Sequence, residues 1–218
     1  MNPILSISIP IVIAYLIGSI PTGFIFVKLI KKQDIRQQGS GNTGATNSMR
    51  VLGFKLALLV LLIDIFKGVG AVLLGSFLYE RMGVSTTGMF ISLVGLSVIL
   101  GHIYSIFLKF KGGKGVATTA GVFAVLTPLP ILIAFVTFII LTAITKYVSV
   151  GSIFGVIMLM LSEFYINMIG QFTDISNLVL ILVMGSIIIY RHKENIRRLS
   201  EGRENQISFR TKSEDQGR

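Results

Sequence analysis

Long runs of apolar residues, separated by short polar segments, make up most of this chain. Each run is close to the length of about 20 residues that a helix needs to cross the hydrocarbon core of a membrane. The runs cover residues 3–29, 52–79, 88–107, 150–168 and 175–190. This pattern predicts an all-α fold, a polytopic membrane helix bundle.

A further apolar run, residues 116–145, carries no charge and is too long for a single comfortable span. Pro128 and Pro130 lie near its middle, where proline removes a backbone donor and ends or kinks a helix. We therefore expect two short helices around these prolines, with protein covering the backbone at the break. Residues 18–23, which contain two glycines and a proline, interrupt the first span.

The lysines and arginines predict the orientation of the chain. Of 20 such residues, the two loops expected outside, residues 80–87 and about 168–175, contain only Arg81. Nearly all the others lie in residues 28–50, 109–114, 146 and 191–212. The N-terminus is therefore expected outside and the C-terminus in the cytoplasm.

The number of spans follows from this orientation. Six spans would return the basic C-terminal tail to the outside, against its positive charge. Dividing residues 116–145 at the prolines gives about seven transmembrane helices and places Lys146 and Ser149 inside.

Composition supports a single membrane domain with a short tail. Hydrophobic residues make up 52% and charged residues 14%, whereas a soluble domain carries about a quarter charged residues. The mean hydropathy is +0.79. We expect residues 1–204 to form the domain and residues 205–218 to be a polar, disordered cytoplasmic tail.

The net charge of +10 could indicate nucleic-acid binding. Basic cytoplasmic loops of a membrane protein explain the same charge, and they attract lipid headgroups and anionic substrates. Membrane lipid is therefore an expected partner and nucleic acid is not. Cysteine is absent, which excludes a thiolate nucleophile and a cysteine-ligated metal.

Four polar segments are expected on the cytoplasmic face, and each carries residues that bind anions: residues 39–50, 101–119, 146–152 and 192–204. In the first, the glycines at 39, 41 and 44 allow the backbone N–H groups to point towards one place. Neutral donors and one arginine follow the same loop: Ser40, Asn42, Thr46, Asn47 and Arg50. Such a loop is typical of an oxyanion site rather than of a simple turn.

Residues 110–115, Phe-Lys-Gly-Gly-Lys-Gly, resemble a phosphate-binding loop without matching a Walker A motif. Leu108 and Gly115 stand where that motif requires glycine and serine or threonine, so nucleotide hydrolysis is not expected. The lysines of this segment fit a membrane anchor as well as a binding site. His102 and His192 lie at cytoplasmic ends of spans, and without nearby acidic residues they predict no metal site.

Three charged residues lie deep inside predicted spans, away from their ends. Asp64 and Lys67 are one helical turn apart, which predicts a neutralising pair that faces the interior of the bundle. Glu163 is a candidate functional carboxylate, or else a structural partner of a residue such as Lys67.

Three motifs resemble those of the bacterial acyl-phosphate:glycerol-3-phosphate acyltransferase family (PlsY). They are SGNTGATNSMR at 40–50, the segment from Gly101 to Thr118 that contains FLKFKGGKGVAT, and HKENIRRLSEGRE at 192–204. Residues 18–23 and 64–68 are similar to further family features. The resemblance extends from the first span through Glu204.

The resemblance implies transfer of a fatty acyl group from acyl phosphate to the 1-hydroxyl of glycerol 3-phosphate. The products are lysophosphatidic acid and phosphate, in the first step of phospholipid synthesis. It further implies seven helices in the bacterial cell membrane, a site facing the cytoplasm and no metal or other cofactor. A transient contact with the enzyme that supplies acyl phosphate is also expected.

By the same resemblance, catalytic roles fall to Ser40, Thr46, Lys111 and Ser149, with Ser40, Thr46 and Ser149 acting on the acyl phosphate. Glycerol 3-phosphate is assigned to Arg50, Lys111, Asn195 and Arg198. The remaining expected substrate-binding residues are Gly41, Asn42, Asn47, His102, Gly112, Gly113, Lys114, His192 and Glu204. Because no side-chain base is evident, a substrate phosphate oxygen is expected to accept the hydroxyl proton.

Two other classes of protein remain open at this point. A transporter for an anionic solute would also use broken helices and basic residues, but with functional charges near the middle of the bilayer. A structural assembly protein would leave the glycine-rich segments without a role. An assay with acyl phosphate and glycerol 3-phosphate distinguishes the enzyme from both.

Overall fold

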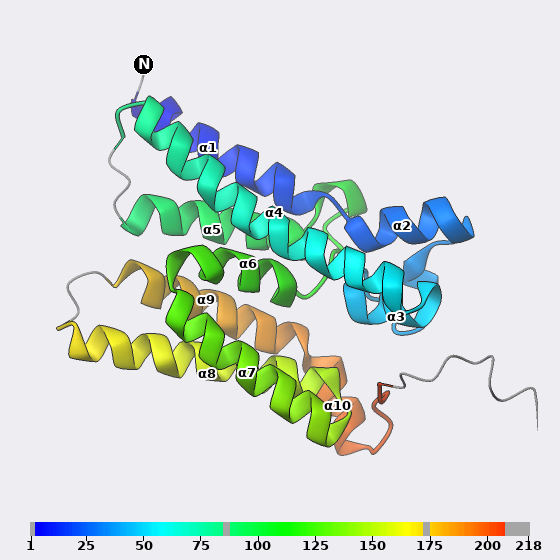
Figure 1. The fold of residues 1–218 in the computed structure, drawn as a ribbon. Coiled ribbons are helices and arrows are strands. Elements are labelled where there is room, and N and C mark those ends of the chain that lie inside the picture. Colours follow the sequence, from blue (N-terminus) through cyan, green and yellow to red (C-terminus); the bar gives the residue numbers. More distant parts are fainter. Residues whose placement is uncertain (1–2, 85–87, 172–174, 208–218) are drawn as a thin grey trace, which may run out of the picture.

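A computed structural model describes residues 3–84, 88–171 and 175–207, and every regular element in these ranges is helical (Figure 1). The first half of the chain forms α1 (Pro3–Ser19), α2 (Thr22–Lys31), the short 3₁₀ turn η1 (Ile35–Gln37), α3 (Ala45–Leu52), α4 (Phe54–Arg81) and α5 (Gly88–Ile103). The second half forms η2 (Ile106–Leu108), α6 (Val116–Leu126), α7 (Pro128–Thr145), α8 (Val148–Ile169), α9 (Ser176–Arg191) and α10 (Lys193–Ser200).

Within the described residues, 5 helical segments are long and apolar enough to cross a membrane. They are Ile4–Lys31, Phe54–Arg81, Gly88–Leu108, Pro128–Thr145 and Val148–Ile169. Two shorter apolar helices, α6 and α9, accompany them. The expected all-helical membrane protein is thus confirmed.

The expected breaks in the apolar runs are present. The first span divides between α1 and α2 at Ile20 and Pro21. The long run divides at Thr127, directly before Pro128, but only the helix before the break is short: α7 has 18 residues. The expectation of two short helices is therefore wrong for α7. Its prolines lie in the first turn, where a missing N–H costs no helical hydrogen bond.

Two helix pairs pack at very short distance because glycines face the neighbouring backbone. In the pair α4–α6, a Cβ atom at Gly121 would lie 2.0 Å from the carbonyl oxygen of Ile65. In the pair α7–α8, a Cβ atom at Gly151 would lie 2.7 Å from the carbonyl oxygen of Phe138. Small residues at such positions allow membrane helices to approach closely. The two pairs form the two walls of the site described below.

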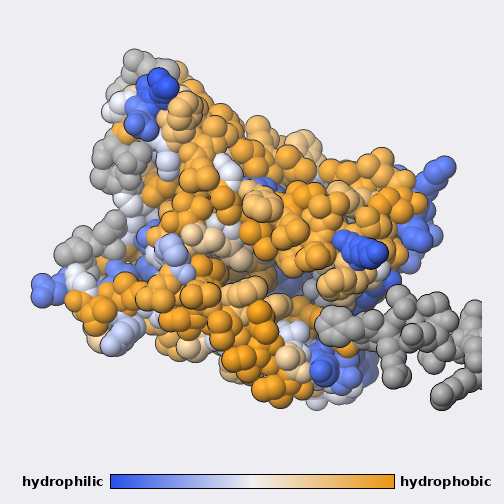
Figure 2. All heavy atoms as spheres, viewed as in Figure 1, coloured by the Kyte–Doolittle hydropathy of each residue, from blue (hydrophilic) through white to orange (hydrophobic). Residues whose placement is uncertain are grey.

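The core lies around α5, which packs against α1, α4, α6 and α9. Its centre contains fully buried side chains, among them Tyr79, Ile99, Phe123 and Ile181. Large apolar side chains cover much of the outer surface, and Figure 2 shows this apolar belt with polar residues gathered towards the two ends. Such a surface suits lipid rather than water.

Several polar segments differ from the expected loops. Residues 45–52 form helix α3, because Gly44 ends the loop in extended backbone and the Asn42 side chain accepts a hydrogen bond from its N–H. Glu80 and Arg81 continue α4, while residues 85–87 of the expected loop lie outside the described residues.

The C-terminal segment contains a helix, followed by a stretch that is hydrogen-bonded to the rest of the protein. Residues 193–200 form α10, and beyond it the N–H of Ile207 donates to the carbonyl oxygen of Lys146 at 2.8 Å. This bond places the start of the tail against the turn between α7 and α8. Disorder was expected for residues 205–218; of these, residues 205–207 are described and residues 208–218 lie outside the described ranges.

The ionisable groups buried in the spans have hydrogen-bond or ion-pair partners. Nζ of Lys67 lies 2.8 Å from Oδ1 of Asp64, so the expected neutralising pair is confirmed. Glu163 bonds instead to Asn167 on its own helix, at 3.2 Å between Oε1 and Nδ2. Lys67 is thus engaged with Asp64, and the suggested Lys67–Glu163 pair is wrong.

Candidate active site

A cavity of about 570 Å³ lies between the α4–α6 pair and the α7–α8 pair. One end is polar and includes residues of α3, the start of α6, the start of α8 and the segment from His192 to Asn205. The other end is apolar and lies among α6, α7 and α8. The cavity therefore joins a site for polar chemistry to a slot within the helix bundle.

Three helix N-termini meet at the polar end. The cavity is lined by the first residues of α3 (Ala45, Thr46), of α6 (Val116, Ala117) and of α8 (Val148, Ser149). The first N–H groups of a helix have no partner inside it, and the helix dipole adds a partial positive charge there. Helix N-termini of this kind bind phosphate and other anions.

Asn47 organises the glycine-rich loop before α3. Its side chain is 1% exposed, and its Oδ1 accepts a hydrogen bond from the N–H of Ser40 at 2.9 Å. Its Nδ2 group donates to the carbonyl oxygens of Ile35, Gln38 and Asn42. Asn47 therefore folds the loop that presents Ser40 and is fully occupied with backbone groups. Its amide is committed to the loop and holds the expected substrate donors in place.

The second glycine-rich segment folds back onto the end of α5. The N–H groups of Gly112 and Gly113 donate to the carbonyl oxygens of Ile103 and His102, both at 3.0 Å. A Cβ atom at Gly113 would lie 2.2 Å from Nε2 of His102. These glycines therefore allow the loop to pack closely against the end of α5. The conformation of the loop in turn determines which of its lysines faces the cavity. Lys114 lines it, whereas Lys111 is exposed away from it.

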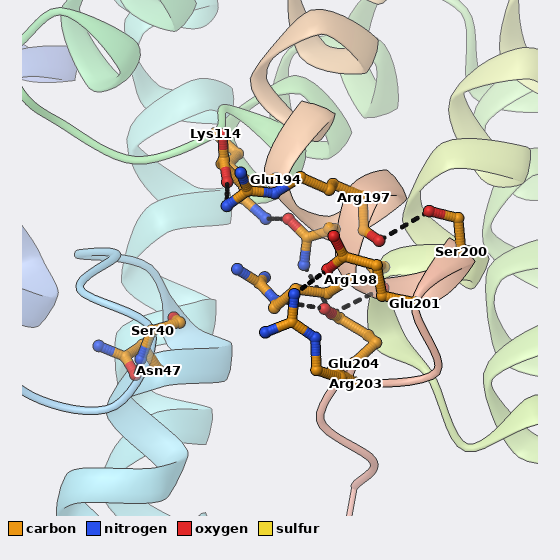
Figure 3. A network of polar contacts seen from close by, with 12 residues as sticks. Ser40, Asn47, Lys114, Glu194, Arg197, Arg198, Ser200, Glu201, Arg203 and Glu204 are labelled. Atoms are coloured by element: carbon orange, nitrogen blue, oxygen red, sulfur yellow. Dashed lines mark hydrogen bonds and ion pairs between the residues drawn. The ribbon is translucent and has the colours of Figure 1, made fainter.

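Glu204 is the centre of the polar network at this end (Figure 3). Its Oε1 accepts hydrogen bonds from Oγ of Ser149 at 3.0 Å and from Nδ2 of Asn195 at 2.6 Å. Its Oε2 accepts from Nε of Arg198 at 2.7 Å. Nζ of Lys114 donates to Oδ1 of Asn195. Figure 3 shows Ser40 and Asn47 on the α3 side, across from this cluster.

The charges at this end have shifted pKa values. Burial opposes ionisation of Glu204, but the hydrogen bonds from Asn195, Arg198 and Ser149 and the charge of Arg198 lower its pKa. Burial, together with nearby arginines, lowers the pKa of Lys114 to about 8, and Glu204 only partly opposes this. The carboxylate is therefore charged at neutral pH, and the lysine titrates close to the physiological range.

His192 is a neutral hydrogen-bonding group. Its Nδ1 lies 2.8 Å from the carbonyl oxygen of Ile188, which fixes the proton on that nitrogen. Burial, with the charge of Lys114 nearby, lowers its pKa to about 4. The unprotonated Nε2 is then an acceptor on a ring that lines the cavity.

A second polar cluster lies deeper, behind His102. Oδ1 of Asp64 accepts from Nζ of Lys67 and, at 3.0 Å, from Oγ1 of Thr22. Nδ1 of His102 lies 3.7 Å from the same oxygen. Lys67 also donates to the carbonyl oxygen of Ile20, at the break between α1 and α2. The cluster fixes that break and supports His102 and, through it, the Gly113 backbone.

Most of the residues expected to form a site meet at this cavity. It is lined by Ser40, Asn42, Thr46, Asn47, Arg50, His102, Lys114, Ser149, His192, Asn195 and Glu204. Five others lie outside its lining: Gly41, Lys111, Gly112, Gly113 and Arg198. Of these, Arg198 still contacts the site through Glu204.

The apolar end was not predicted from the sequence. There the cavity is lined by Ala117, Ala120 and Ala124 on one face of α6, and by Ile131, Leu132, Phe135 and Phe138 on α7. Small and large apolar residues of this kind occur in every buried membrane helix. Only the α4–α6 and α7–α8 packing shows which of them border a space.

Among the described residues, no group of three or more His, Asp and Glu side chains is arranged to hold a metal ion. Positive charge at the polar end comes instead from Arg50, Lys114 and Arg198.

Comparisons with known proteins agree with this geometry. A family profile described as "Glycerol-3-phosphate acyltransferase" matches residues 8–202. A glycerol-3-phosphate acyltransferase of Thermoanaerobacter sp. (strain X514) is 42% identical over 201 residues, which cover 92% of this chain and 95% of the relative. One of Staphylococcus aureus (strain Newman) is 42% identical over 205 residues, covering 93% and 98%.

Two crystal structures of PlsY, an integral membrane glycerol 3-phosphate acyltransferase, are similar in fold. The glycerol 3-phosphate form has a TM-score of 0.83 and 38% identity, covering 93% of this chain and 96% of that chain. The lysophosphatidic acid form has a TM-score of 0.80 and 37% identity, covering 94% and 96%.

Proposed function

The chain belongs to the glycerol-3-phosphate acyltransferase family, and from this premise we propose the reaction that its cavity performs. It transfers a fatty acyl group from acyl phosphate to the 1-hydroxyl of glycerol 3-phosphate. The products are lysophosphatidic acid and inorganic phosphate. The observation that carries this proposal is the single cavity whose cationic, donor-rich end continues into an apolar slot.

The polar end fits two phosphate groups side by side. Arg50, Lys114 and Arg198 supply positive charge from three different segments, and the N-termini of α3, α6 and α8 supply backbone donors. Guanidinium groups bind phosphate through paired hydrogen bonds. We assign glycerol 3-phosphate to Arg50, Asn195 and Arg198, with Lys114 and His192 adjacent. Lys111 is exposed and lies outside the cavity lining.

The acyl phosphate is assigned to the α3 and α8 side. The hydroxyl groups of Ser40, Thr46 and Ser149 and the first N–H groups of the two helices are available to its headgroup. Ser149 Oγ also donates to Glu204, which orients the hydroxyl group at this end of the cavity. Such preorganised donors stabilise the negative charge that develops on the carbonyl oxygen.

The chemical step requires no covalent enzyme intermediate. The 1-hydroxyl oxygen attacks the carbonyl carbon, a tetrahedral oxyanion forms, and the bond from carbon to the phosphate oxygen breaks. Phosphate leaves and its oxygen accepts the hydroxyl proton. His192 is neutral, because burial lowers its pKa to about 4, and its Nδ1 proton is held by the carbonyl oxygen of Ile188.

The apolar slot is assigned to the acyl chain. It starts next to Ser149 and runs between the alanine face of α6 and the aromatic residues of α7. Burial of each methylene group is worth about 0.8 kcal/mol. Donor affinity is therefore expected to rest largely on the chain, and acceptor affinity on charge.

The topology supports a site on the cytoplasmic side. The turn at Lys146 contacts Ile207, so the α7–α8 turn and the segment after α10 share one side of the membrane. With α6 and α9 counted as membrane helices, the chain crosses seven times and ends opposite to where it starts. The basic residues on the cavity side favour the cytoplasm for that side.

The donor is tested with purified protein, glycerol 3-phosphate and either acyl phosphate or acyl-CoA, by following lysophosphatidic acid. Acyl phosphate is expected to support turnover, and EDTA is expected to leave the initial rate unchanged. Turnover with acyl-CoA alone, or loss of activity in EDTA that one metal restores, would contradict the proposal.

A further inference from the structure

One face of α8 borders the apolar end of the cavity. Gly151, Gly155, Leu159 and Glu163 follow one another at intervals of four residues, which places them on the same side of the helix. The first three line the cavity, and Glu163 does not. Leu159 is the first large side chain on this face and is 1% exposed. Along α8, the lining of the cavity therefore ends at Leu159.

A polar layer lies one helical turn beyond Leu159. Glu163 is 2% exposed, and the side chain of Thr127 lies against its carboxyl group. Among the described residues, neither Oε2 of Glu163 nor the hydroxyl of Thr127 has a hydrogen-bond partner within normal geometry. Thr127 directly precedes Pro128, which lines the cavity. Polar atoms therefore lie beyond the apolar end of the slot, at the break between α6 and α7.

Outside α8, the neighbour of this carboxyl group is Thr127, at the break between α6 and α7. The bond between Glu163 and Asn167 lies within α8 and joins no other helix. A buried carboxyl group with an unused oxygen is costly in an apolar region. A hydrocarbon chain cannot offer that oxygen a hydrogen bond, so its terminal methyl group is excluded from the layer.

The distance along α8 gives the scale of the slot. From Ser149, beside the reacting carbonyl, to Leu159 the helix rises about 15 Å, and Glu163 lies about 6 Å further. An extended hydrocarbon chain with bonds of about 1.5 Å advances roughly 1.3 Å per carbon. The slot therefore holds about 12 carbons before Leu159, and one more helical turn would hold about four more.

We infer that Leu159 and, behind it, Glu163 determine the length of the acyl chain that the cavity accepts. This inference rests on the proposed function, because it takes the acyl chain of the donor as the occupant of the slot. The volume of the Leu159 side chain limits the length of the acyl chain. The polarity of Glu163 sets a second limit, about one helical turn further along α8. Chains beyond the limit leave their last carbons outside the slot and gain no further binding.

The test is a series of kcat/KM values for saturated acyl phosphates of increasing chain length. Each methylene group that enters the slot is expected to raise kcat/KM about fourfold, and the rise stops at a limiting length. Leu159→Ala is expected to move this limit to chains about two carbons longer, and Leu159→Phe to shorter chains. Leu161→Ala, on the lipid-facing side of the same helix and 57% exposed, is the matched control and leaves the limit unchanged.

A double variant tests the deeper layer. Leu159→Ala combined with Glu163→Ala is expected to extend the limit by about one further helical turn, or about four carbons. Leu159→Ala combined with Glu163→Gln retains a polar group and keeps the limit of Leu159→Ala alone. If Leu159→Ala does not purify in folded form, Leu159→Val is expected to give a shift of about one carbon.

The outcomes separate this inference from the proposed function. Turnover of acyl phosphates with the same limiting length in wild type and in all Leu159 variants would overturn the inference alone. An equal shift in Leu161→Ala would also overturn it. No transfer from an acyl phosphate of any length by the wild-type protein would overturn the proposed function.

Discussion

Glu204 holds together residues that are far apart in the sequence. It accepts hydrogen bonds from Ser149 on α8 and from Asn195 and Arg198 on α10. A carboxylate, like a phosphate group, is an anion whose oxygens accept several hydrogen bonds. It therefore holds three groups of the proposed substrate site in one place and balances the charge of Arg198.

The acceptor site can be tested at Arg198. Arg198→Ala is expected to raise KM for glycerol 3-phosphate more than KM for acyl phosphate. Loss of a charge-assisted hydrogen bond costs about 1.5–3 kcal/mol, roughly a ten- to hundredfold change in transition-state binding. Arg198→Lys restores charge without the paired donors and should recover only part of the loss.

Arg197 provides the matched control. It lies next to Arg198 on α10, but its side chain is 66% exposed and pairs with Glu194. Arg197→Ala is expected to leave both KM values unchanged. Full activity in Arg198→Lys, with an unchanged acceptor KM in Arg198→Ala, would make Arg198 a membrane anchor and contradict its place in the site.

Lys114 predicts a specific pH dependence. A lysine is charged below its pKa, and burial with nearby arginines brings the pKa of Lys114 to about 8. Its positive charge is therefore lost as pH rises through 8, and kcat/KM for glycerol 3-phosphate is expected to fall there. Profiles of kcat/KM against pH report the groups of the free enzyme. Lys114→Arg remains charged and should remove this fall; superimposable profiles for the two proteins would exclude the role.

At the scale of helices, the width of the cavity depends on close packing within each wall. Gly68 and Gly121 bring α4 and α6 together, and Gly151 and Gly155 do the same for α7 and α8. The two pairs have few contacts with each other compared with those inside each pair. Each pair thus packs as a unit, and the cavity lies between the two units.

Two glycines of α4 test this arrangement. A Cβ atom at Gly68 would lie 2.4 Å from the carbonyl oxygen of Thr118, whereas at Gly70 nothing lies within 4 Å. Gly68→Ala is expected to cost about 1–3 kcal/mol through overpacking. Gly70→Ala is expected to be neutral or to stabilise by about 0.5–1 kcal/mol. Thermal unfolding in detergent measures both, and an equal shift in Tm for the two variants would contradict the packing argument.

The elements were largely predictable from hydrophobic runs, prolines and glycines. Spans, the break before Pro128 and the gathering of three motifs follow from local sequence. The choice of Lys114 over Lys111 as the cavity lysine does not. It depends on two backbone hydrogen bonds, from Gly112 and Gly113 to the end of α5, which no pattern in the sequence specifies.

The role of Asn47 was missed for a similar reason. In the sequence it stands among residues that donate to anions, and its type fits that use. In the structure the loop between Ile35 and Asn42 curls around it and uses both ends of its amide. The role of Asn47 in holding the loop depends in part on its hydrogen bond to the carbonyl oxygen of Ile35. Because Ile35 lies 12 residues earlier in the chain, the neighbouring sequence does not reveal this contact.

The topology of the whole molecule can be tested by labelling single cysteines, since the chain contains none. A membrane-impermeant maleimide is expected to label Arg81→Cys in intact cells. Lys146→Cys and Ser200→Cys should react only after the membrane is opened, because both lie on the same side as the polar end of the cavity. External labelling at position 146 would remove one crossing and contradict the seven-span arrangement.

The central claim is that one cavity binds both substrates and joins them. The most direct measurement is the stoichiometry of products formed by purified protein from acyl phosphate and glycerol 3-phosphate. We expect one lysophosphatidic acid for each phosphate released, dependence on both substrates, and a loss of kcat in Thr46→Val with smaller changes in either KM. Phosphate release without acyl transfer, or full activity in Thr46→Val together with Ser149→Ala, would contradict the account.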